Sequence, residues 1–96
     1  MNFARKIILH SPVSDERLLD SFVEKCLRDK VSLIAVVGPD CVRLEDMIDA
    51  LVVGEGTDAE RFICTSSHPG EPFGDVVNMV ECWEAAGCGP YQEVHL

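Results

Sequence analysis

Hydrophobic and polar positions alternate along this chain in a pattern that occurs three times. Each time, a short apolar run ends in small polar residues, and a segment with apolar residues at helical spacing follows. The apolar runs cover residues 6–10, 31–37 and 61–66, and a further run with period-two alternation covers residues 91–96. Short runs of this kind predict strands, and the longer segments between them predict amphipathic helices.

Three helices are predicted, over about residues 15–29, 42–52 and 73–86. Ser14 is a suitable N-cap for the first, Pro72 is suited to the first position of the third, and Gly87 is suited to its end. The first helix has one apolar stripe, formed by Leu18, Leu19, Phe22, Val23, Cys26 and Leu27. The third has another, formed by Phe73, Val76, Val77, Val80 and Trp83.

The predicted fold is a single α/β domain of 96 residues with the order βαβαβαβ, in two or three layers. Its four strands form a mostly parallel sheet. Right-handed crossovers favour two strand orders, 2-1-3-4 and 1-2-3-4. Each order leaves one face of the sheet short of helices. We therefore expect self-association, most simply as a homodimer in which the partner covers that face.

The charge of the chain narrows the range of partners. It has 17 acidic and 8 basic residues, a net charge of −9, and no cluster of lysine and arginine. Nucleic acids and anionic membranes attract basic surfaces, so neither is expected as a partner. The acidity suits a basic protein partner, or serves solubility alone. No signal peptide is recognised and no apolar run approaches the ~20 residues of a membrane span, so we expect a cytoplasmic protein.

Five cysteines are present, in spacings that match neither a zinc motif nor a Cys-x-x-Cys pair. A disulfide framework is not expected in the cytoplasm. Cys26 and Cys64 lie at positions predicted to be buried. Cys82 lies off the apolar stripe of its helix and is predicted to be exposed.

The strand exits carry most of the residues capable of chemistry. Parallel strands end at one edge of the sheet, where ligands usually bind. The candidate ligand-binding residues at that edge are His10, Asp40, Cys41, Ser66, Ser67 and His68.

Each of these residues also has a simpler interpretation. The polar segment 65–70 suits a turn whose hydroxyls bond the local backbone, and Glu71 beside it disfavours a phosphate site. Cys41 and His68 could form a nucleophile–base pair, or Cys41 could be an ordinary residue at a helix start. His10, Asp40, Cys41 and His68 are possible zinc ligands, but their spacing does not require a metal. His95 is expected at the surface or edge, away from this cluster.

No complete catalytic set is recognisable, and no cofactor is predicted. The favoured hypothesis is a small, acidic, non-enzymatic binding or interaction module. The alternative is a small-molecule or metal-binding domain, possibly an enzyme, that uses the carboxyl edge of its sheet.

Overall fold

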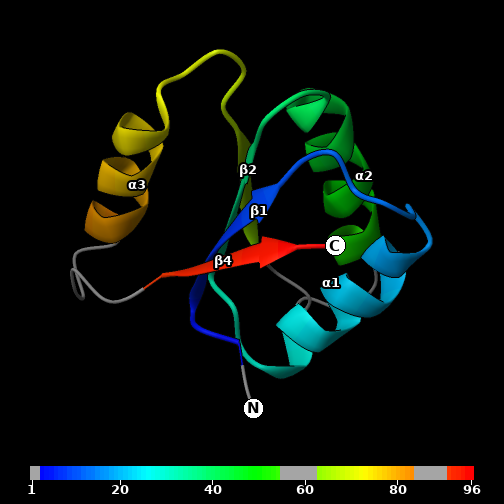
Figure 1. The fold of residues 1–96 in the computed structure, drawn as a ribbon. Coiled ribbons are helices and arrows are strands. Elements are labelled where there is room, and N and C mark those ends of the chain that lie inside the picture. The colour runs from blue at the N-terminus through cyan, green and yellow to red at the C-terminus, as the bar shows by residue number, and fades with distance from the viewer. Residues whose placement is uncertain (1–2, 55–62, 84–90) are drawn as a thin grey trace.

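The structure is a computed structural model that describes residues 3–54, 63–83 and 91–96. Its elements follow the order βαβαβαβ, as predicted (Figure 1). The strands are β1 (Lys6–His10), β2 (Leu33–Val37), β3 (Cys64–Ser67) and β4 (Gln92–His95). The helices are α1 (Leu18–Arg28), α2 (Cys41–Val53) and α3 (Phe73–Cys82). No helix within these ranges is long and apolar enough to cross a membrane.

The four strands form one parallel sheet in the order β3-β2-β1-β4. This is neither of the two orders expected from the sequence. The most apolar strands occupy the centre, where both faces are covered, and every residue of β2 is buried. The more polar strands β3 and β4 take the two edges.

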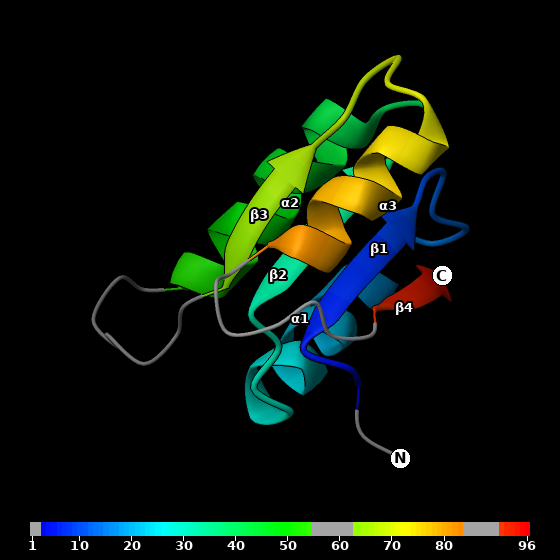
Figure 2. The ribbon, with the colours of Figure 1, turned by 90° about the vertical axis from the view of Figure 1, so that its left-hand side faces the viewer.

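The sheet is covered on both faces. Helices α1 and α2 pack on one face and α3 packs on the other (Figures 1 and 2). The core on the first face is built around Ile7, Leu9, Ile34 and Val36, and the core on the second face around Ile8, Leu33, Ala35 and Val37.

The bare sheet face that motivated a dimer is not found among the described residues. Ile8 and Ala35 on the α3 face are fully buried, and Leu33 is 2% exposed. Trp83 and Tyr91 pack beside α3 as half-buried residues and extend the cover. The coverage of the sheet therefore provides no argument for self-association, which stays a prediction.

The start of α1 differs from the prediction. The helix begins at Leu18, not Asp15, and no side chain caps it. The Asp15 carboxylate accepts a hydrogen bond from the Arg17 backbone N–H at 2.9 Å and forms a separate turn before the helix. Ser14, the expected cap, instead donates its backbone N–H to the Leu96 carbonyl at 3.1 Å.

The end of α3 and one cysteine also differ from the prediction. The helix ends at Cys82, and the predicted stop at residues 86–87 lies outside the described residues. Pro72 precedes the helix as its N-cap. Cys26 is buried and Cys82 exposed, as predicted, but Cys64 is only half-buried because its strand lies at a sheet edge.

Candidate metal centre

The strand order reverses its direction between β1 and β4. The chain leaves β1 and β2 toward helices on one face, and leaves β3 toward α3 on the opposite face before it returns to pair with β1. In open α/β sheets, ligands bind beyond the carboxyl ends of the strands where the strand order reverses in this way. His10 is the last residue of β1 and His95 is the last residue of β4.

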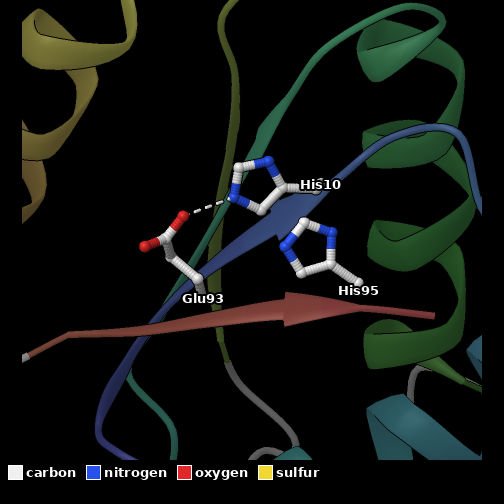
Figure 3. A group of neighbouring side chains, drawn as sticks. All are labelled: His10, Glu93 and His95. Carbon is white, nitrogen blue, oxygen red and sulfur yellow. Dashed lines mark hydrogen bonds and ion pairs between the residues drawn. The ribbon is translucent and has the colours of Figure 1, made fainter.

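Three potential metal ligands converge there: His10, Glu93 and His95. The parallel register pairs His10 with His95 and Ile8 with Glu93, so all three side chains lie on the α3 face of the sheet. The His10 Nε2 lies 2.8 Å from Glu93 Oε1. One ligand atom from each residue lies within 4.8 Å of the other two (Figure 3).

Ring stacking holds His10 in place. Its imidazole is nearly parallel to that of His95, with centroids 4.2 Å apart and an angle of 7° between the planes. It also stacks on Phe73, at 5.5 Å and 18°. Phe73 was expected in the inner stripe of its helix, but it is 40% exposed because it opens α3 beyond the buried part of the sheet.

The donor set suits a transition-metal ion. Imidazole nitrogens and one carboxylate oxygen are common zinc ligands, and three protein ligands leave a coordination position for water or another group. Glu93 and His95 are exposed and His10 is half-buried, so an ion can reach them from solvent. Without an ion, the same contact is a hydrogen bond between an imidazole and a carboxylate.

The predicted residues of the polar turn form a second cluster on β3. The Ser66 Oγ lies 2.9 Å from His68 Nε2, and His68 Nδ1 lies 2.9 Å from Glu71 Oε2. The atoms follow the order of a Ser–His–carboxylate relay. However, all three residues belong to one short segment, and the side chain of His68 is only 11% exposed. These contacts support the simpler interpretation, in which the segment is a turn whose polar side chains hydrogen-bond one another. Ser67 is half-buried beside them.

Asp40 and Cys41 lie apart from both clusters. Cys41 is 2% exposed and lies in the core on the face covered by α1 and α2. His68 lies on the opposite face. It contacts Ser66, and Ser66 is the register partner of Ala35, which belongs to the core under α3. The sheet therefore separates Cys41 from His68, so the structure favours Cys41 as an ordinary residue at a helix start over a Cys–His pair.

Asp40 is exposed and paired with Arg43 at 3.0 Å, and Arg43 also contacts Glu16. These two carboxylates raise the pKa of the Arg43 guanidinium. A wide hollow of about 590 Å³ lies here between the β2–α2 and β3–α3 connections, and its lining comprises Gly38, Pro39, Asp40, Cys41, Val42, Arg43, Asp46, Pro69 and Gly70. The hollow contains two carboxylates, of Asp40 and Asp46, and one guanidinium, of Arg43, which already pairs with Asp40. This excess of negative charge does not favour an anionic ligand.

Sequence reasoning found His10 and missed Glu93 and His95. His95 is exposed on an edge strand, as expected, but it is not remote from the strand exits, because it is the direct register partner of His10. The period-two pattern of residues 91–96 already places Glu93 and His95 on one face. This pattern could be connected with His10 only once β4 was known to lie beside β1.

The fold and the cluster define a small parallel α/β domain with two histidines and a glutamate at the carboxyl edge of its sheet. A family model described as a domain of unknown function (DUF7684) matches residues 1–93, and the chain belongs to that family. Neither a curated protein nor a solved structure matches the chain.

Proposed function

We propose that this domain binds a divalent transition-metal ion, with zinc as the best-matched ion, through His10, Glu93 and His95. The observation that carries the proposal is the mutual approach of the three ligand atoms to within 4.8 Å. Tetrahedral zinc with bonds of ~2.0–2.2 Å holds its ligands about 3.3–3.6 Å apart. The stacked rings of His10 and His95 share no common plane, so at least one imidazole has to rotate out of the stack before both nitrogens can face one ion.

The chemistry of the site selects the kind of ion. Two imidazoles favour zinc, copper, nickel or cobalt over magnesium and calcium, which prefer oxygen ligands. The net charge of −9 attracts any cation toward the molecule. The four cysteines in the described ranges are free thiols, which is compatible with a reducing compartment such as the cytoplasm.

Isothermal titration calorimetry with Zn²⁺, and Co²⁺ absorption spectroscopy, test this proposal on the full chain. His10→Ala and His95→Ala should each weaken binding at least about 10-fold, since each removes one of three ligands. Glu81→Gln is a matched control, because Glu81 is exposed and lies at the far end of α3. The proposal is wrong if the parent protein binds neither ion, or if both histidine variants bind like the parent.

A second candidate function is that of an interaction module for a basic protein. The exposed sides of α1 and α2 support it, because they carry rows of carboxylates, among them Asp20, Glu24, Asp46 and Asp49. Such a surface steers a basic partner through charge, so its binding weakens as salt rises. This function would be favoured by a basic partner that binds the metal-free parent protein in low salt and does not bind the Asp46→Asn/Asp49→Asn variant.

A further inference from the structure

β4 lies at one edge of the sheet. It pairs only with β1, and in the described part of the chain no element lies beyond it (Figure 2). The backbone groups of successive strand residues point to opposite sides. The Leu96 carbonyl is bonded within the molecule, to the Ser14 N–H. By alternation, the backbone groups of Val94 also face inward, and those of Glu93 and His95 face outward.

We propose that a second copy of this chain pairs along β4 and that its Glu93 supplies a fourth ligand to the metal. The strands run antiparallel about a two-fold axis through Val94. The inference rests on the proposed metal site and goes beyond it by naming the partner and the group that the partner contributes.

The hydrogen-bonding pattern permits this register and those displaced by two residues, and the side chains choose between them because a displaced register opposes two glutamates or two histidines. An antiparallel pair centred on Val94 places Glu93 opposite His95 of the second copy, and His95 opposite Glu93 of the second copy. Both positions present outward N–H and C=O groups, so each pair exchanges two backbone hydrogen bonds. A shift by one residue would oppose an outward residue to an inward one and lose those bonds.

The side chains in this register are complementary. The axis is perpendicular to the sheet, so the α3 faces of both copies lie on the same side. Directly opposed residues have Cβ atoms about 4.5–5.5 Å apart. The carboxylate of one copy therefore lies beside His95 of the other, and the reciprocal contact forms by symmetry. Each of the two sites then contains His10, His95 and Glu93 of one copy and, as a fourth ligand, the Glu93 carboxylate of the other copy.

The exposed charges of β4 also distinguish a second copy from other strands. Charged side chains on an edge strand normally prevent pairing with foreign chains. The side chain of Glu93 is 45% exposed and contacts His10, but against most strands its carboxylate would face no second imidazole or cation. Only a strand that offers an imidazole or a cation opposite Glu93, and a carboxylate opposite His95, matches both positions. This chain offers both.

Light scattering on the full chain tests the inference at high micromolar concentration. With Zn²⁺ the mass should be twice 10.6 kDa, and EDTA should reduce it. Glu93→Gln and His95→Ala should each lower the zinc-dependent dimer fraction, and Glu81→Gln should not. Zinc binding with no change in mass would overturn the shared site and leave the proposed function intact. A lack of zinc binding by the parent would overturn both.

A mixing experiment tests the shared carboxylate directly. The double variant His10→Ala/His95→Ala and the variant Glu93→Gln each keep two ligands per site, so each should show little Co²⁺ absorption alone. In a mixed dimer, one site contains both histidines of the Glu93→Gln copy and Glu93 of the double-variant copy. The mixture should therefore absorb more than the sum of the two solutions. A mixture equal to the sum would overturn the inference, as would a dimer equally stable in zinc and in EDTA. Circular dichroism confirms that each variant is folded.

Discussion

The imidazole rings of His10 and His95 stack face to face with their centroids 4.2 Å apart. They come from the first and the last strand and are direct partners in the β1–β4 register. The backbone ladder of the sheet therefore fixes their separation, and no loop is involved. A metal site built on regular strands holds the backbones of its ligands in place, so the change on ion binding is a rotation of the imidazoles out of their stack.

Zinc should raise the thermal stability of the protein. An ion that binds only the folded state adds ~2.7 kcal/mol to the free energy of unfolding when its free concentration is 100 times its Kd. For a domain of this size, that corresponds to a rise in Tm of roughly 10 °C or more. Differential scanning calorimetry with and without Zn²⁺ measures it. The rise should fall to about half or less in His95→Ala and persist in Glu81→Gln. An equal rise in both variants would place the ion elsewhere.

Gly38→Ala should destabilise the protein more than Gly70→Ala does. Both glycines have positive φ, 96° for Gly38 and 71° for Gly70, so either alanine carries a backbone cost of about 1 kcal/mol. At Gly38 the added Cβ would also lie 2.6 Å from the backbone oxygen of Ser11, the residue that follows β1, whereas at Gly70 it meets open space. Urea denaturation should give a loss of at least ~2 kcal/mol for Gly38→Ala. Equal losses would contradict the close approach.

The thiols should differ widely in their reactivity. Burial raises the pKa of the Cys26 thiol to about 12, so almost no thiolate forms at neutral pH. Cys82 is exposed and should react first with a maleimide or with Ellman's reagent. Mass mapping of the labelled native protein identifies the order, with Cys82→Ser as the control. Rapid labelling of Cys26 in folded protein would show that α1 does not pack as described.

Asp29 should contribute to the loss of stability in acid. Its carboxylate accepts the Phe3 N–H at 2.9 Å and pairs with Lys25 at 3.2 Å, and both contacts lower its pKa. A carboxyl with a lowered pKa in the folded state stabilises the protein fully above about pH 4 and loses that contribution as pH falls further.

Urea midpoints measured from about pH 6 to pH 2 test this contribution. Asp29→Asn should be less stable than the parent at pH 6, and the difference should shrink toward pH 2. Asp49→Asn, an exposed carboxylate on α2, should follow the parent at every pH. A constant difference for Asp29→Asn across the range would contradict the lowered pKa.

The sequence predicted the element order and the buried central strand, because the apolar runs and helical stripes are local patterns. It did not predict the strand order, which depends on how polar strands such as β3 and β4 avoid the centre of the sheet. That one unknown also explains the incomplete site. His10 was recognised at a strand exit, but its partner His95 could be assigned only after β4 was placed beside β1.

A different ambiguity concerns Cys41. Its position before a helix made it a candidate ligand-binding residue at the sheet edge, but the side chain packs inward under α2. A residue at a helix start can point into the core or out of it, and the sequence alone does not distinguish the two directions. Phe73 shows the reverse case, since an aromatic residue on the apolar stripe of α3 lies over the half-buried imidazole of His10 instead of in the core.

The pairing of β1 with β4 makes ion binding a test of whether the whole domain has assembled. Three crossovers separate the two strands along the chain, and bringing such distant segments together has the entropic cost of a long closed loop. A bound ion would oppose separation of these strands as a reversible cross-link does. A fragment that lacks either strand would have no site, so occupancy would report on the folding of every element in between.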